Sequence, residues 1–311
     1  MLSRVADSLF WMSRYIERTD GILRMLKINY ASSQENNLDF TWKPVLKIFS
    51  FLDEDAIARI EKDSRAVLQL MVVDKENPNS VVNMVTRSRE NARAVQDHIT
   101  KEVWQCLNEF YHLVREDRLS HMLTTEDPIT VLDALIKQGT LYYGTTEITM
   151  ARGEGMCFMN IGKCLERAIQ SADILNVRFS DLSHETASVT DPYYWKYFLM
   201  SISGYELYLK NYRTGFEARN ILDLVIFNDN FPRSVHYSVQ LLSRYFERLK
   251  SDRNQDGFDK INFRVGKLKS SVQFSNVDLI AEEGLPAYLD RIRAELYAVG
   301  QLLNQHYFAY S

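Results

Sequence analysis

Apolar residues recur at intervals of three, four or seven along most of the chain, which is the spacing of one face of an α-helix. The first such stretch covers residues 3–31, with apolar side chains at Val5, Leu9, Met12, Ile16, Leu23 and Leu26. No segment alternates between apolar and polar residues for the length of a strand, although 71–73 and 224–227 are rich in β-forming residues. The pattern therefore predicts an all-α fold without a sheet.

Capping residues, prolines and polar clusters mark where the predicted helices begin and end. The asparagines at 36–37 predict a loop, and Asp127-Pro128 predicts the start of a long helix. Polar residues predict a connection at 179–190 and an exposed linker at 251–257. The segments between these breaks give about ten helices, which we expect to pack as a multi-helix bundle.

The length of the chain allows one large domain or two modest ones. The predicted helices are alike on both sides of a break at Gly153 and Gly155. We therefore expect a single helical domain over residues 1–311, and the break leaves an internal pseudo-repeat open as a second interpretation.

One hexapeptide occurs three times, each time within a predicted helix. Ser-Arg-Tyr-Ile-Glu-Arg at 13–18 returns as Ser-Arg-Tyr-Phe-Glu-Arg at 243–248 and, more loosely, as Gly-Lys-Cys-Leu-Glu-Arg at 162–167. At about 100° per residue, the small residue four before each glutamate and the cation three before it share the helix face of that glutamate. The small residues are Ser13, Gly162 and Ser243, and the cations are Arg14, Lys163 and Arg244.

Two interpretations of these faces remain open. In the first, each glutamate pairs with its cation, which stabilises an exposed helix by only about 0.3–0.5 kcal/mol, and the small residues permit close helix packing. In the second, two or three faces meet in a polar groove. Glu17, Glu166 and Glu247 would then accept hydrogen bonds, and the cations would bind a carboxylate or phosphate.

Two other polar clusters are candidates for a site. Arg89 and Arg93 share a helix face with Glu90 close by, which is more typical of a solvated charged surface. Arg152 and Glu154 lie at the predicted helix break, where either a binding site or a plain connection is expected.

Composition and charge narrow the class of function. The net charge of −4 and the pI near 5.9 lack the strong basic surface that nucleic-acid binding requires. No apolar run reaches the ~18 residues of a membrane span. The three cysteines contain no C-x-x-C pair, so we expect reduced thiols in a cytoplasmic protein.

The sequence predicts no metal and no cofactor. A ferritin-like di-iron site needs two Glu-x-x-His motifs, and the chain has only the one from Glu109 to His112. No phosphate-binding loop or nucleophile elbow occurs either.

Four separated segments carry a resemblance to a known family. They are Ser3–Arg18, Ser88–Arg93 with Trp104 following, Gly155–Arg167 and Phe227–Val235. In this order they resemble the bacterial alpha-E domain family, a family of unknown function. Asn228 stands where the family usually has Asp, and Cys164 where it usually has an aromatic residue.

The resemblance implies an all-helical accessory protein of an ATP-dependent system that forms peptide or amide bonds. Its implied partners are a circularly permuted ATP-grasp protein, beside or fused to the domain, and a transglutaminase-like protein. A stand-alone enzyme that acts on an amide or amino-acid substrate, and a purely structural scaffold, remain alternatives.

The motif positions and the helix break together give the candidate substrate-binding residues. They are Arg14, Glu17, Arg18, Arg89, Glu90, Asn91, Arg93, Arg152, Glu154, Glu166, Arg167 and Arg233. The resemblance covers the copies at 13–18 and 162–167 best, so Glu17-Arg18 and Glu166-Arg167 rank as the paired site. The copy at 243–248, with Glu247-Arg248, ranks as a repeat of the motif that serves only helix packing.

Overall fold

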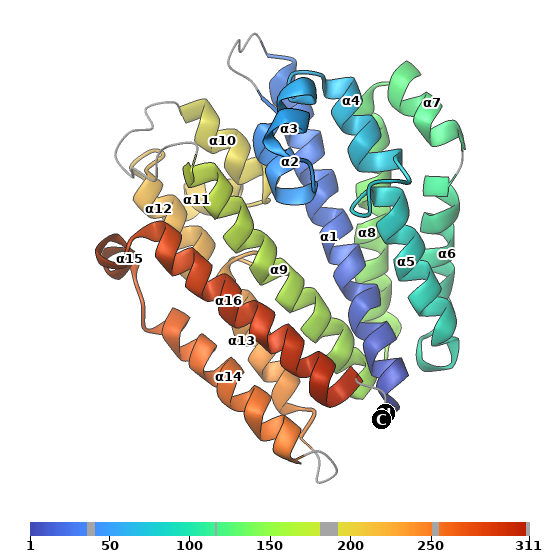
Figure 1. Ribbon diagram of the computed structural model, residues 1–311, viewed down its shortest axis with the longest axis vertical. Helices are drawn as coiled ribbons and strands as arrows, with labels where there is room; N and C mark the ends of the chain where they lie inside the picture. Colours follow the sequence, from blue (N-terminus) through green and yellow to red (C-terminus); the bar gives the residue numbers. More distant parts are fainter. Residues whose placement is uncertain (36–40, 116, 181–191, 251–254, 309–311) are drawn as a thin grey trace. The chain divides into compact units, whose positions relative to one another are not determined.

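The computed structural model describes residues 1–35, 41–115, 117–180, 192–250 and 255–308. These residues form sixteen α-helices and no strand (Figure 1), so the all-α prediction is confirmed. The prediction of about ten helices is wrong. Several helices, such as α3 (Glu54–Ile60) and α12 (Ala218–Leu222), have only five to seven residues, too few for a 3.6-residue pattern to separate them.

The predicted loop at 36–37 lies outside the described residues, as do 181–190 of the predicted connection and 251–254 of the predicted linker. The last part of that linker is helical, because α14 begins at Gln255. Helix α14 ends at Gln273.

The other helices are α1 (Ser3–Ser33), α2 (Lys43–Phe49), α4 (Ser64–Leu68), α5 (Val81–Ala94), α6 (Lys101–Arg115), α7 (Asp117–Thr125), α8 (Pro128–Thr149), α9 (Glu154–Ser180), α10 (Pro192–Ser201), α11 (Tyr205–Asn211), α13 (Val235–Glu247), α15 (Val277–Glu283) and α16 (Leu285–Leu303).

The chain forms two compact units. The first unit contains Met1–Arg14, Ala151–Leu199 and Ser203–Ser311, and the second contains Tyr15–Met150 and Met200–Ile202. Helix α1 therefore contributes its first turns to one unit and the rest to the other. All six apolar positions predicted for this helix are buried. The single domain and the pseudo-repeat stay predictions.

Four helices form the centre of the first unit. Helices α13 and α16 both pack on α9, and α14 packs on α13 and α16 (Figure 1). Each of the four thus contacts two others, as in a four-helix bundle. The central helix α9 is buried along most of its length, because apolar residues occupy almost every side of it.

The second unit has a similar arrangement. Helix α6 packs on α5 and on α8. Lys27 of α1 forms an ion pair with Asp133 of α8 at 2.7 Å, and Arg87 of α5 lies over the ring of Tyr15 of α1. Helices α1, α5, α6 and α8 therefore contact one another in a ring.

The two runs rich in β-forming residues are π-helices, Gln69–Val73 and Asp223–Phe227. Each ends at an Asx turn, in which Asp74 or Asn228 accepts a hydrogen bond from the backbone two residues later at 2.9 Å. Ser80 and Ser234 then cap α5 and α13. The same order of π-helix, turn and cap therefore occurs once in each unit.

Candidate functional site: the Glu-Arg helices

Glu166, the glutamate of the hexapeptide on α9, is buried and paired with Arg14. Its Oε2 accepts hydrogen bonds from Nε and Nη2 of Arg14 at 2.9 and 2.7 Å. Gln170, one turn later, donates to Oε1 at 3.5 Å. Arg14 also lies 4.7 Å from the ring centroid of Trp11, a cation–π distance. Glu166 is only 1% exposed, so this ion pair is shielded from solvent.

Gly162, the small residue four before Glu166, lies where α9 and α1 approach closely. A Cβ atom added at Gly162 would be 2.3 Å from the carbonyl oxygen of Phe10, well inside van der Waals contact. The glycine shares the helix face of Glu166. The close packing expected in the first interpretation therefore occurs at the same level as the ion pair.

Glu17, the glutamate of the first copy, belongs to the second unit. It is 0% exposed, and its Oε2 accepts a hydrogen bond from the hydroxyl of Tyr143 on α8 at 2.6 Å. One turn further along α1, Arg24 donates to Asp20 at 2.8 Å. Burial alone would lower the pKa of Arg24, but the hydrogen bond to Asp20 and the negative charges of Asp20 and Glu17 raise it.

The arginine after each of these glutamates contacts the turn that precedes a serine-capped helix. In the second unit, Nη1 of Arg18 donates to Oδ1 of Asn79 at 3.4 Å. In the first unit, Nη1 of Arg167 donates to the carbonyl of Pro232 at 3.1 Å. Ser171 donates to the carbonyl of Arg233 at 2.6 Å in the same turn. Each arginine therefore links its own helix to the start of the next long helix of its unit.

Proline is common in the first turn of a helix, so Pro232 predicts the start of α13, but the helix begins three residues later, at Val235. The side chain of Ser234 accepts a hydrogen bond from the backbone of Tyr237 at 2.9 Å, which makes Ser234 the N-cap. Pro232 lies in the turn instead, with its carbonyl free of the helix and available to Arg167.

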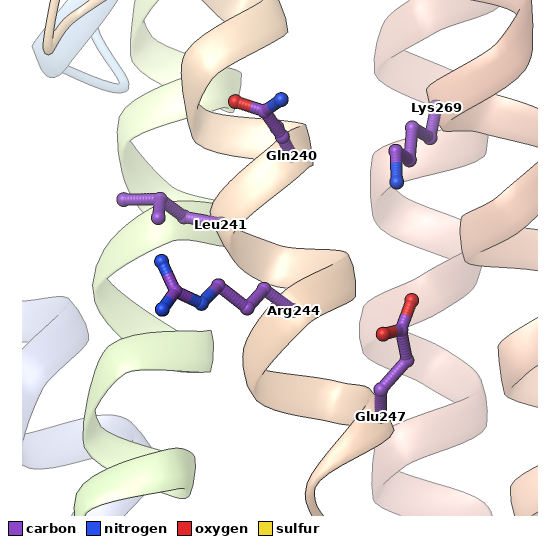
Figure 2. A pocket seen from close by; sticks show the side chains of 5 residues that line it. All are labelled: Gln240, Leu241, Arg244, Glu247 and Lys269. Carbon is purple, nitrogen blue, oxygen red and sulfur yellow. The ribbon is translucent and has the colours of Figure 1, made fainter.

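The third copy of the hexapeptide differs from the other two because its charged residues are exposed. Ser243 donates to Glu247 at 3.0 Å, and Arg244 is exposed on the same helix. Arg244 and Glu247 line a groove of about 340 Å³ with Gln240, Leu241 and Lys269 (Figure 2). From the sequence, this copy is predicted to serve only helix packing. In the structure, its cation Arg244 and its carboxylate Glu247 lie at a surface groove.

The arginine-rich segment of α5 forms a charged helix face. Nη1 of Arg89 donates to Glu90 at 2.5 Å, and Nε donates to Asn108 of α6 at 3.3 Å. The same guanidinium lies over the rings of Trp104 and Tyr111. Arg89 thus links α5 to α6.

The other residues of this segment lie nearer the surface. Glu90 and Arg93 are exposed and 3.7 Å apart, and Asn91 is half-buried. An exposed pair of this kind contributes little to stability.

Arg152 and Glu154 are exposed where α9 begins. Glu154 accepts a hydrogen bond from the N-terminal ammonium of Met1 at 2.9 Å. The break that suggested a site therefore carries an ion pair within the first unit.

Other groups give little sign of reactive chemistry. All three cysteines are free and buried, and burial raises the pKa of Cys106 to about 11. The described part of the chain contains no group of three or more His, Cys, Asp or Glu residues arranged to hold a metal ion. None of the described helices combines the length and the apolar composition that a membrane crossing requires.

The sequence placed the motif residues on helix faces but did not give their partners. Tyr143 is 126 positions from Glu17, and Arg14 is 152 positions from Glu166. Lys269, which lines the groove beside the third copy, also lies outside every recognised motif. Helical periodicity indicates which face is buried and not which residue lies opposite it.

Comparison with known proteins agrees with these observations. A family described as a predicted alpha-helical domain with a conserved ER motif matches residues 1–308. An uncharacterized protein of Mycobacterium bovis and one of Mycobacterium tuberculosis are each 24% identical to the chain over 323 residues. The match covers 95% of this chain and 35% of each relative, so the chain spans about a third of their length.

No solved structure matches the chain. The family match covers nearly the entire sequence, and the Glu-Arg pair in its description is the feature that recurs on α1 and α9. The chain therefore belongs to the Alpha-E family.

Proposed function

We propose that this chain is a non-catalytic helical accessory domain that binds an ATP-grasp-type protein of a system that forms peptide or amide bonds. The burial of Glu17 and Glu166 carries the non-catalytic part of the proposal. The two carboxylates are 0% and 1% exposed, and each already accepts hydrogen bonds within its own unit. A general base must come within hydrogen-bond reach of its substrate, whereas Glu17 and Glu166 are enclosed and bonded to other side chains of the protein.

The arginines of the motif support the same proposal. Arg18 and Arg167 both contact the turn before a capped helix, which is a structural position. Charged residues in such positions fix how helices pack and do not need a substrate. On this proposal, the Glu-Arg motif maintains a rigid helical surface on which a partner can bind.

The partnership itself rests on the family resemblance and on the length of the relatives. In those relatives, the segment similar to this chain is about a third of a longer protein. A domain that occurs within a longer chain is expected to act together with other domains. The ATP-grasp protein as partner is what the family resemblance implies.

Co-expression with a circularly permuted ATP-grasp protein, the partner that the family resemblance implies, tests the proposal. We expect the two proteins to elute together in size-exclusion chromatography and the ligase activity to change when this chain is added. Ovalbumin, which shares no relation with the system, serves as the control protein. Separate elution together with an unchanged ligase activity would refute the partnership.

A further inference from the structure

The groove between α13 and α14 carries charges of both signs at the surface of the first unit. Its charged residues are Arg244 and Glu247 of α13 and Lys269 of α14. Figure 2 shows that Glu247 and Lys269 extend toward the space between the two helices, whereas Arg244 extends from the other side of α13. The two cations are thus separated by the surface of α13, and the carboxylate lies between the helices.

The volume of the groove, about 340 Å³, is at the lower end of the range of small-molecule sites. Ser243 holds the carboxylate of Glu247 in place through a hydrogen bond of 3.0 Å. The side chain of Arg244 is exposed and forms no ion pair or hydrogen bond with the described residues, so its guanidinium is available to a ligand. Arginine binds carboxylates through two parallel N–H bonds.

The mixture of charges restricts the class of ligand. A compact dianion such as phosphate would be attracted by Arg244 and Lys269 but repelled by Glu247. A ligand with a carboxylate at one end and an ammonium at the other would satisfy both signs. Gln240 adds an amide that can donate to and accept from a peptide bond, and Leu241 adds an apolar contact.

We propose that this groove binds a short peptide with free ends. Arg244 binds its carboxylate, Glu247 accepts a hydrogen bond from its amino group across the surface of α13, and Gln240 pairs with a peptide bond. The separation of Arg244 from Glu247 favours an elongated ligand over a single amino acid. The inference goes beyond the proposed partnership, because binding would be a property of this chain alone.

Titration of the purified full chain with trialanine, followed by NMR or calorimetry, tests the proposal. We expect binding of the free acid, and an affinity about tenfold lower for trialanine amide, which lacks the carboxylate. Arg244→Gln should lower the affinity for the free acid by at least about tenfold. Arg213→Gln, which changes an exposed arginine that does not line the groove, is the matched control and should have no effect.

Several results would overturn the proposal. They are no binding of trialanine at about 10 mM, equal affinity for the acid and the amide, or equal affinity for inorganic phosphate. The comparison of acid and amide uses the unchanged protein, so it decides the question even if a variant fails to fold. A chain that binds trialanine but not the ligase refutes only the partnership, and the reverse result refutes only the groove.

Discussion

Each of the first two motif glutamates is buried and meets a different partner. Glu166 accepts from a guanidinium, whereas Glu17 accepts from a phenol. Burying a charge without a partner is costly, so both glutamates depend on groups that come from distant parts of the chain. The sequence could predict that these faces are polar, but it could not predict that one is closed by Arg14 and the other by Tyr143.

Glu166→Gln should destabilise the protein, because it leaves the buried guanidinium of Arg14 without a charged partner. We expect the free energy of unfolding to fall by about 3 kcal/mol, measured by urea denaturation. Glu90→Gln, which removes an exposed carboxylate, is the control and should change it by less than about 0.5 kcal/mol. If Glu166→Gln left stability unchanged but removed an activity on an amide substrate, the enzyme alternative would be favoured.

Tyr143→Phe should also lower stability, because Glu17 loses a hydrogen-bond donor in a buried position. A loss of about 1–3 kcal/mol is expected. A double-mutant cycle with Glu17→Gln measures the coupling between the two side chains. Additive effects of the two changes would show that the hydrogen bond contributes little.

Close helix packing explains why the motif on α9 has glycine and not serine at its small position. The backbone of Phe10 occupies the space where a Cβ atom of residue 162 would lie. The helical period of about 100° per residue predicted that Gly162 shares the helix face of Glu166. How closely the neighbouring helix approaches depends on tertiary packing, which periodicity does not encode.

Gly162→Ala should therefore destabilise the protein by about 1–3 kcal/mol, since a helix backbone would have to move. Gly144→Ala on α8 is the matched control, because nothing lies within 4 Å of its added Cβ. There the change should stabilise the protein by about 0.5–1 kcal/mol, as glycine is unfavourable within a helix. Thermal denaturation of both variants should give shifts of opposite sign, and a destabilising effect of both would contradict this explanation.

The turns before α5 and α13 show what local sequence does predict. Before α5, the Asx residue and the serine cap bond to their own backbone neighbours, an interaction that local sequence can indicate, whereas Pro232 indicates a start of α13 that is three residues too early. The π-helices before the two turns are not recognisable, since residues with high β propensity form them. Tertiary packing here overrides propensity, as it often does over five residues.

For the molecule as a whole, periodicity predicted the fold class because most of the helices are long and amphipathic. It failed on the number of helices, since the short ones do not complete two turns. Composition predicted reduced cysteines, and all three are free. The groove beside α13 could not be predicted, because it depends on the approach of Lys269 from another helix.

The native protein should react slowly with Ellman's reagent at pH 8. All three thiols are buried, and burial raises the pKa of both Cys106 and Cys157, which keeps them protonated at this pH. The chain contains three cysteines, so we expect three reactive thiols after denaturation. Rapid reaction of any thiol in the native protein would show that the interior opens readily.

The division of α1 between the two units has a consequence for the order in which the chain folds. Residues 15–150 make up almost all of the second unit, so its helices can assemble while synthesis continues. Phe10 and Arg14 belong to the first unit, and Gly162 and Glu166, their neighbours on α9, are translated about 150 residues later. The N-terminal turns of α1 therefore leave the ribosome well before α9 but are buried only after α9 has been made, and their apolar surface stays open to chaperones in the interval.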